Sequence, residues 1–449
     1  MFTYVKLKNF KSFKNVYINL EDKKNVPKSM AVIYGANGSG KSTIVQAFLT
    51  LKKTIGTMQV KDLLKDLLEN KITPPEDIPL KPELMLDFIK SRLANNTIEK
   101  IIEESKMIGT SDDMLMEFGF LINESTGRYL MEFNNSNLIH ERLEYKILKN
   151  RGCCFNIENG KLEINSNLFE SKDFFVEIEK QIQMYWGKHS LLSILKYEME
   201  EKSDSFIASN VSINLMNILS TFDDISYKVQ NMHEETSLLR ISNPILQNLE
   251  GGMVEKTFEK DLDKVEKVLN QFFTSLFDDV KKAFYKRTEK KGRINYKLFF
   301  NKQIEKYNYD IDFRYESSGT QEILELIPYL MLAIEGKTVV IDEYGNGIHD
   351  LLATRLMREV AKNIKGQLII TTHNTLLMDQ AEIKPESLYF IMNDKTFNKS
   401  VKCVTEIEER LHPNYNYRNR YFNNELYSDG LPRNNGKIDF SELAKLYSS

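Results

Sequence analysis

The sequence predicts an α/β fold, in which a sheet with flanking helices is interrupted by a large, mostly helical insertion. Three observations support this fold class. An apolar run at 30–34 leads into a glycine-rich loop and then a helical pattern. Two further apolar runs, at 338–341 and 366–372, end in polar side chains, and about 300 residues separate the two halves. Buried strands that lead into helices are typical of layered α/β proteins.

The overall composition excludes several classes of protein. The 449 residues carry a net charge of −3, so the chain is not globally basic and any contact with DNA or RNA needs a local patch. Three cysteines are too few for a disulfide framework. No apolar run approaches the ~20 residues needed to span a bilayer. We therefore expect a cytoplasmic protein without a membrane partner.

The N-terminal elements predict a phosphate-binding loop. Alternating apolar and polar residues at 2–9 and 15–20 predict a strand pair, and the run at 30–34 predicts a buried strand. The following residues, 35–43, read Gly-Ala-Asn-Gly-Ser-Gly-Lys-Ser-Thr and match G-x-x-x-x-G-K-[ST] at every fixed position. Apolar spacing at 44–49 predicts the helix that must follow such a loop.

This loop predicts a site for ATP and Mg²⁺. Glycine lets backbone N–H groups turn inward, where they and the helix N-terminus bind phosphate oxygens. We expect Lys41 between the β- and γ-phosphates, and the Ser42 hydroxyl on Mg²⁺. The other loop residues assigned to phosphate binding are Asn37, Gly38, Ser39, Gly40 and Thr43.

The middle of the chain is predicted to form the insertion. Helix-forming sequence at 55–114 and a largely helical pattern over 149–292 predict helices. Alternation at 115–148 instead predicts β-hairpins around a turn at 123–127. Strand character returns near residue 293. The lobe that contains the phosphate loop then comprises 1–54, 115–148 and 293–449.

Two apolar runs in the C-terminal half predict neighbouring strands that end in catalytic side chains. Thr338–Ile341 precedes Asp342 and Glu343, and the later run ends at His373. One predicted helix, at about 350–364, separates the runs, so their ends should be neighbours. We expect Asp342 to hold Mg²⁺, Glu343 to act as the general base and His373 to contact the γ-phosphate. In isolation, an acidic surface turn would explain the acidic pair equally well, and a histidine beyond a buried strand is more often a packed or capping residue than a catalyst.

A short polar motif precedes an apolar helical pattern about 20 residues before the Asp-Glu pair. It spans Glu316–Gln321 and contains Ser317, Ser318 and Gly319. Small hydroxyl residues and glycine at a helix start can form an anion-binding cap. An ordinary N-cap is the alternative, and the position of the motif before the Asp-Glu strand favours anion binding.

In this order, the motifs resemble those of ABC-type ATPases, and among them the soluble SMC/RecF/OLD branch. Asn9-Phe10-Lys11-Ser12-Phe13 is similar to the opening of that branch, and Tyr34–Ser42 is similar to its P-loop. Ile341–His349 resembles the Asp-Glu-x-x-Asn-Gly-Leu-His run of OLD-like AAA-type ATPases, which occur in anti-phage abortive-infection and PARIS-type systems. Residues 418–432 resemble their C-terminal segment. Asp350 departs from the family's usual proline.

The resemblance implies an ABC-type P-loop ATPase sheet and a composite ATP site. Two protomers would meet head to tail, in a homodimer or a higher homo-oligomer. Ser317, Ser318 and Gly319 of one protomer would close the ATP site of the other. Asn346 would lie in the loop that crosses between the two sites.

Two functions are consistent with this resemblance. In the first, the chain is the ATPase and sensor subunit of an anti-phage defence system, controls a separate effector such as a Toprim-type nuclease, and responds to DNA or a phage protein. The 76 residues after His373 are too few for a Toprim domain, so we expect no nuclease activity in this chain. In the second, the chain is a RecF- or SMC-like repair or recombination ATPase that binds DNA.

Overall fold

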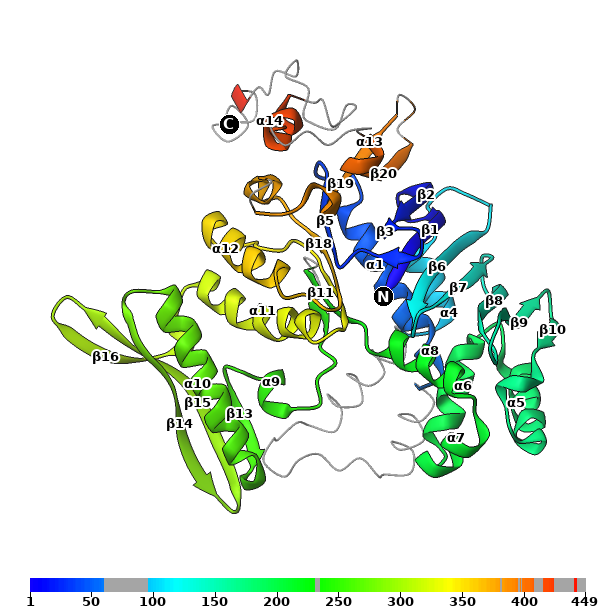
Figure 1. The fold of residues 1–449 in the computed structure, drawn as a ribbon, viewed down its shortest axis with the longest axis horizontal. Helices are drawn as coiled ribbons and strands as arrows, with labels where there is room; N and C mark the ends of the chain where they lie inside the picture. Colours follow the sequence, from blue (N-terminus) through cyan, green and yellow to red (C-terminus); the bar gives the residue numbers. More distant parts are fainter. Residues whose placement is uncertain are drawn as a thin grey trace.

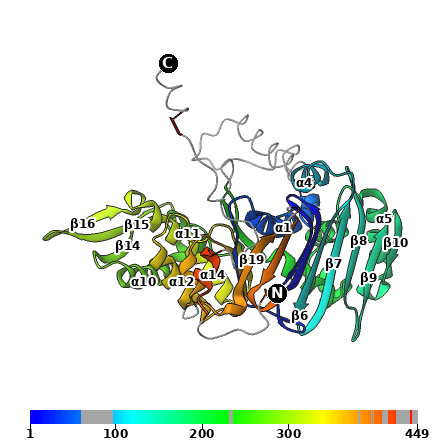
Figure 2. The same cartoon turned by 90° about the horizontal axis from the view of Figure 1, so that it is seen from above.

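The computed structural model describes residues 1–59, 96–230, 235–379, 382–394, 396, 398–407, 415–423 and 440–441. Within this part, the chain forms two seven-stranded sheets, a four-stranded sheet and a small strand pair (Figure 1). Seen from above, the antiparallel seven-stranded sheet and the four-stranded sheet lie on opposite sides of the central sheet (Figure 2). The small pair joins β3 (Glu21–Lys23) and β4 (Val26–Pro27).

The central sheet carries the predicted phosphate loop and catalytic strand ends. Its five inner strands are parallel and its two edge strands are antiparallel to their neighbours. Every residue of β5, β17 and β18 is buried, as expected for parallel strands covered on both faces. In sheet order the strands are β12 (Glu235–Leu238), β11 (Ser226–Gln230), β17 (Thr338–Ile341), β18 (Gln367–Thr371), β5 (Met30–Tyr34), β19 (Leu388–Asn393) and β20 (Lys399–Cys403).

Helices cover both faces of this sheet, and each face has its own core. Ala31 and Ile33 pack in the cluster that contains α1 (Lys41–Thr54), whereas Val32 packs in the cluster that contains α11 and α12. Alternate residues of one strand point to opposite faces, so a single strand serves both cores. The helices of the second face are α11 (Ser318–Ile334) and α12 (Asp350–Ala361).

The second seven-stranded sheet is antiparallel and packs against α1 from the other side. It confirms the strand pair predicted at the N-terminus and the hairpins predicted over 115–148. Asn123 and Glu124 both have positive φ, as a two-residue hairpin turn requires. In sheet order its strands are β10 (Lys161–Ile164), β9 (Arg151–Glu158), β8 (Leu138–Lys146), β7 (Ser125–Phe133), β6 (Met114–Ile122), β1 (Phe2–Phe10) and β2 (Phe13–Asn19).

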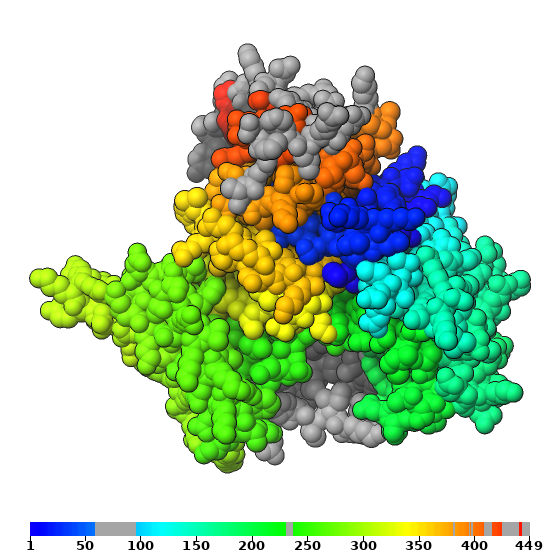
Figure 3. Space-filling view, viewed as in Figure 1, coloured from blue at the N-terminus to red at the C-terminus, as the bar shows by residue number. Residues whose placement is uncertain are grey.

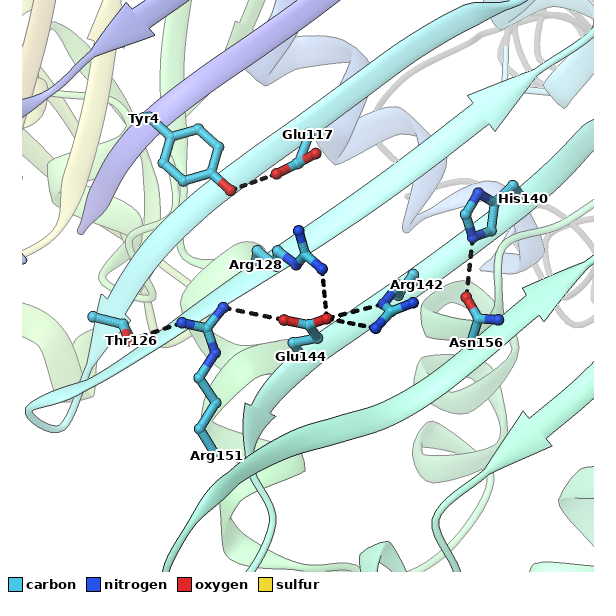
Figure 4. Close-up of polar contacts among 9 residues, drawn as sticks. All are labelled: Tyr4, Glu117, Thr126, Arg128, His140, Arg142, Glu144, Arg151 and Asn156. Atoms are coloured by element: carbon cyan, nitrogen blue, oxygen red, sulfur yellow. Dashed lines mark hydrogen bonds and ion pairs between the residues drawn. The ribbon is translucent and has the colours of Figure 1, made fainter.

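One face of this antiparallel sheet is polar. On it, Glu144 accepts hydrogen bonds from Arg128 at 2.6 Å and from Arg142 at 2.7 Å, and forms an ion pair with Arg151 at 3.2 Å (Figure 4). Although partial burial raises the pKa of Glu144, the hydrogen bonds from the arginines outweigh it and lower that pKa to about 2. A half-solvated face of this kind is common in antiparallel sheets.

Helices pack on the apolar face of the same sheet. Phe222 of α8 stacks near Phe2 of β1 and meets Phe120 of β6 edge-on, so it joins α8 to two strands of this sheet. The helices between β10 and β11 are α5 (Lys172–Tyr185), α6 (Leu191–Glu200), α7 (Asp204–Asn210) and α8 (Ile213–Asp223). The shorter helices elsewhere are α4 (Ile98–Ser105), α9 (Pro244–Gln247), α13 (Val404–Ile407) and α14 (Tyr417–Phe422).

A four-stranded sheet with one long helix projects away from the two larger sheets (Figures 1 and 3). β15 is central, with β14 on one side and β13 and β16 sharing the other side. Its elements are β13 (Gly251–Glu255), α10 (Glu259–Leu276), β14 (Val280–Lys290), β15 (Arg293–Ile304) and β16 (Tyr307–Asp312).

The structure corrects in part the helical character predicted for 149–292. Helices α5 to α10 lie in this range, but so do six strands, β9 to β14, and β11 belongs to the central sheet. Exposed lysines in β14 and the short length of β11 hide the two-residue alternation on which strand prediction depends. The helices predicted for 60–95 and the resemblance at 424–432 lie outside the described residues. The division into lobe and insertion stays a prediction.

Within the described residues, no helix is both long enough and apolar enough to cross a membrane.

Candidate phosphate-binding and catalytic site

The glycine-rich loop joins β5 to α1 at the carboxyl edge of the central sheet. Gly38 and Gly40 adopt φ values of 75° and 113°, in the left-handed region that favours glycine. A side chain at Gly35 would place its Cβ 2.3 Å from the Ser39 Oγ, so the loop is tightly wound. Gly40 is the N-cap of α1 and leaves the N–H groups of the first turn without a capping side chain.

Lys41 lies across this loop as a buried cation. Its Nζ donates hydrogen bonds to the carbonyl oxygens of Gly35 at 2.7 Å and Ala36 at 3.1 Å. Burial lowers the pKa of Lys41, and the charges of Asp342 and Glu343 act in the opposite direction. In the described part of the chain the hydrogen bonds of this buried ammonium go to neutral carbonyls, which fits an anionic ligand because such a ligand would restore the charge balance.

Parallel pairing brings the acidic pair next to β18, which ends two residues before His373. Ile341 is in register with Ile370, so Asp342 lies beside Thr371. The Thr371 hydroxyl donates to Asp342 Oδ1 at 2.5 Å. Asp342 is only 2% exposed, and its Oδ2 is buried with no hydrogen-bond partner among the residues that the structure describes. A buried, unpaired carboxylate oxygen fits a cation site and suits Mg²⁺, which prefers oxygen ligands.

Glu343 is held in an uncommon backbone conformation. Its φ is 53°, which for a residue other than glycine costs on the order of 1–3 kcal/mol. Its N–H donates to Thr371 Oγ1 at 2.9 Å, and its Oε2 accepts a hydrogen bond from Asn346 Nδ2 at 3.2 Å. The tight turn therefore fixes the backbone of Glu343 against the neighbouring strand, while Asn346 contacts its carboxylate.

His373 is electrostatically coupled to the same three charged groups. Its partial burial and the charge of Lys41 lower its pKa, whereas Glu343 and Asp342 raise it. The net lowering keeps the ring neutral at pH 7, with one nitrogen as donor and the other as acceptor. The predicted proximity of Lys41, Asp342, Glu343 and His373 is thus present.

The motif at Ser317–Gly319 begins α11. Ser317 is the N-cap, and its Oγ accepts a hydrogen bond from the Thr320 N–H at 3.2 Å. Gly319 abuts the loop after Glu343, because a Cβ there would lie 2.6 Å from the Gly347 carbonyl oxygen. Within the described part of the chain, no hydrogen bond joins Ser317, Ser318 or Gly319 to the phosphate loop. Ser317 therefore acts as an ordinary N-cap, and an anion bound by this segment would have to come from another molecule.

Three contributors to the site were not predicted. Thr371 bridges Asp342 and Glu343, and its place in the run Thr371-Thr372-His373 was the only signal for it. Lys399 of β20 donates from its Nζ to the Gly38 carbonyl oxygen at 2.9 Å. The Lys228 carbonyl oxygen of β11 accepts from the Asp342 N–H at 2.8 Å. Nothing in the local sequence around these two lysines indicates contact with the loop or the acidic pair.

Thr371→Val is expected to lower the free energy of unfolding by about 1–3 kcal/mol, because it leaves the Glu343 N–H and Asp342 Oδ1 without their partner. Urea denaturation measures this loss, and the ATPase rate at increasing Mg²⁺ measures any weakening of the metal site. Thr338→Val is the matched control, since Thr338 is also buried and its hydroxyl makes no hydrogen bond within the described residues. Equal losses in both variants would contradict a bridging role for Thr371.

The fold and the site together are those of an AAA-type P-loop ATPase domain. The chain belongs to the AAA family described as "AAA domain, putative AbiEii toxin, Type IV TA system", whose model matches residues 30–379. A second model, described as an AAA domain, matches residues 4–52.

Two solved structures are among those similar to this chain. The SMC head domain from Thermotoga maritima has a TM-score of 0.38 and 14% identity, over 90% of this chain and 98% of that chain. The Smc head domain with an extended coiled coil from Pyrococcus furiosus, bound to the C-terminal domain of ScpA, has a TM-score of 0.41 and 12% identity, over 90% and 97%. No curated protein matches the chain by sequence.

Proposed function

We propose that the chain binds ATP with Mg²⁺ at the loop between β5 and α1, and hydrolyses it with Glu343 as general base. The observation that carries this proposal is the convergence of a buried cation, a buried unpaired carboxylate oxygen, a second carboxylate and a neutral imidazole at one sheet edge. This combination fits phosphoryl transfer to water, where catalysis depends on positioning and charge stabilisation.

Each residue has a defined role in this proposal. The loop N–H groups of 37–43 and Lys41 would bind the phosphates. Ser42 and Asp342 would hold Mg²⁺, which neutralises phosphate charge and orients the reacting group. Glu343 would accept a proton from the attacking water, and His373 would contact the γ-phosphate.

A second copy of the chain would complete the site. Ser317, Ser318 and Gly319 and the loop that contains Asn346 belong to adjoining backbone segments, because Gly319 packs on Gly347. Two large apolar side chains flank these segments in sequence and lie in solvent: Tyr315 is 80% exposed and Leu351 is 66% exposed. Exposed apolar residues beside polar ones are common at protein interfaces. They support a dimer in which Ser317–Gly319 and Asn346 of each protomer face the ATP of its partner.

Gly319→Ala is expected to abolish ATP-dependent dimerisation while leaving ATP binding to the monomer within about twofold, because the new Cβ clashes with backbone that cannot yield freely. Light scattering after size exclusion measures dimerisation, and binding of a fluorescent ATP analogue measures affinity. Ser318→Ala is the control for a substitution at the same helix start. Loss of its hydroxyl should weaken the dimer less than Gly319→Ala does. A Gly319→Ala protein that dimerises normally with ATP would contradict the role of this segment.

We further propose that the ATPase is the sensor and regulatory subunit of an anti-phage defence system. The description of the matched family names a toxin and a Type IV TA system, which supports a role beside a second component. A separate effector, such as a Toprim-type nuclease, would be held by this chain, and DNA or a phage protein would trigger its release. ATP binding and hydrolysis would act as the switch between the holding and releasing states.

Purification of the full chain from its native host tests this regulatory role. We expect a protein partner in fixed stoichiometry that leaves the complex after phage infection, and that stays bound when Glu343→Gln blocks turnover. Lys53→Ala, a change of a partly buried lysine of α1 that pairs with Glu104, is the control for the effect of mutation on capture. DNA recovered without any protein partner would contradict the regulatory role and favour a repair ATPase.

A further inference from the structure

The four-stranded sheet has one covered face and one open face. α10 packs on the first face, against side chains that include Ala283, Tyr285 and Leu298. Alternate residues of β14 and β15 point the other way, and no described element covers them (Figure 1). The open face is therefore free to contact another molecule.

Cations on the covered face are neutralised within the chain. Arg287 pairs with Asp263 at 2.6 Å and with Glu266 at 2.7 Å, both on α10. Lys302 pairs with Asp279 and Glu316, each at 3.0 Å. Charge on this side is thus part of the packing between helix and sheet.

The open face instead carries a row of cations that we name the cation ladder. β14 and β15 contribute five exposed basic side chains to it and no acidic one, whereas the neighbouring strands β13 and β16 add Glu255, Asp310 and Asp312 to the same face. One of them, Lys286, pairs with Asp310 of β16 at 3.5 Å. Lys290, Arg293 and Lys297 make no ion pair within the described part of the chain. The members of the ladder are Lys282, Lys286, Lys290, Arg293 and Lys297.

The register of the ladder places like charges opposite each other. Lys286 faces Lys297, and Lys290 faces Arg293 across the hairpin. Directly opposed like charges destabilise an antiparallel pair. The segment 280–312 is also basic as a whole: it contains ten Lys or Arg and four Asp or Glu, although the net charge of the chain is −3. An anionic partner would relieve this repulsion.

The chemistry of the face favours contact with a phosphate backbone over stacking on bases. Phe284 and Phe299 lie between the cations but are half-buried, and Lys286 covers Phe299 with its Nζ 4.0 Å from the ring centroid. Beside the ladder runs a groove of about 490 Å³, lined by basic Lys297 and Arg314 and also by acidic Glu250 and Asp312. Single-strand binding surfaces, in contrast, expose aromatic rings for stacking.

We propose that the cation ladder binds the backbone of double-stranded DNA. Lys282, Lys286 and Lys290 recur every four residues along one strand, about 13 Å apart, so they can follow a line of phosphates. Contacts of this kind position a duplex without reading its sequence. The surface is distinct from the ATP site, and its binding does not depend on turnover.

Fluorescence anisotropy of the full chain with a 30-base-pair duplex of arbitrary sequence tests this proposal. The triple variant Lys290→Glu, Arg293→Glu, Lys297→Glu is expected to bind at least about tenfold more weakly, with the slope of log K against log salt reduced by about 2–3. The matched control reverses Lys260, Lys264 and Lys267, three exposed cations of α10, and should stay within about twofold of wild type.

A neutral triple variant, with glutamine at 290, 293 and 297, should show an intermediate loss of duplex affinity. It keeps the test informative if the charge-reversed variant misfolds. Thermal unfolding of each variant confirms folding. Duplex affinity that is unchanged by ladder reversal, or equally reduced by the α10 control, would overturn the proposal. So would tighter binding of single-stranded DNA that persists after ladder reversal.

Discussion

Glu343→Gln is expected to abolish ATP turnover, while the variant still binds ATP. The amide has the size of the carboxylate and can keep its contact with Asn346, but it cannot accept a proton from water. General-base catalysis typically contributes about 10²–10⁴-fold, so kcat should fall by at least about 100-fold. Phosphate release measures turnover, and equilibrium binding of a fluorescent ATP analogue measures affinity.

The same variant should accumulate as an ATP-bound dimer, because the step that releases the closed state is blocked. Glu359→Gln provides the control, since Glu359 lies exposed on α12 and, within the described residues, forms ion pairs only with Arg358 and Lys362 nearby in sequence. Its turnover should equal that of wild type. Normal hydrolysis by Glu343→Gln would show that another group is the base.

Lys41→Ala is expected to lose nucleotide binding. Hydrogen bonds to a charged group contribute about 1.5–3 kcal/mol, which corresponds to a roughly tenfold to 100-fold weaker Kd for each one lost. We expect the thermal stability of the variant to stay unchanged while its ATP affinity falls. Lys41 is a buried cation that hydrogen-bonds neutral carbonyls, and burial lowers its pKa. Isothermal titration with ATP and Mg²⁺ and a thermal melt without nucleotide measure the two quantities.

Lys53→Ala is the matched control, since Lys53 lies on the same helix and pairs with Glu104 near the surface. It should leave ATP affinity unchanged. A Lys41→Ala protein that melts earlier yet binds ATP with wild-type affinity would make Lys41 a structural residue of the loop.

The sequence predicts the elements whose patterns are local. The loop and its flanking strand and helix follow from one continuous stretch, 30–49, with fixed glycine positions. Neighbouring positions for Asp342 and His373 follow from two fully buried strands joined by a single helix. These predictions need no knowledge of distant residues, and the first two strand pairs are equally self-contained.

Elements stabilised by distant partners could not be predicted in this way. β11 is a short strand whose Lys228 is buried because Glu322 and Glu325 of α11 pair with it at 3.1 and 2.6 Å. A lysine inside a buried strand obscures the apolar pattern, and its acidic partners lie almost 100 residues later in the chain. The burial of a strand by tertiary neighbours overrides local propensity.

The same limit applies within the site. Thr371 takes its role from register with the neighbouring strand, and Lys399 reaches the phosphate loop from the edge strand β20. Neither contact has a signature in the surrounding residues. The motif residues could therefore be predicted from the sequence, whereas the residues that orient their side chains could not.

Mixing two inactive variants tests the composite ATP site most directly. Ser317→Arg should keep the phosphate loop and Glu343 but block the segment that closes the partner's site, and Glu343→Gln should have the opposite defect. Each variant alone should hydrolyse no ATP. In an equimolar mixture with random pairing, half of the dimers carry one complete site, so turnover should approach about a quarter of wild type. A mixture that stays inactive, or a Ser317→Arg protein that is active alone, would contradict a site built from two chains.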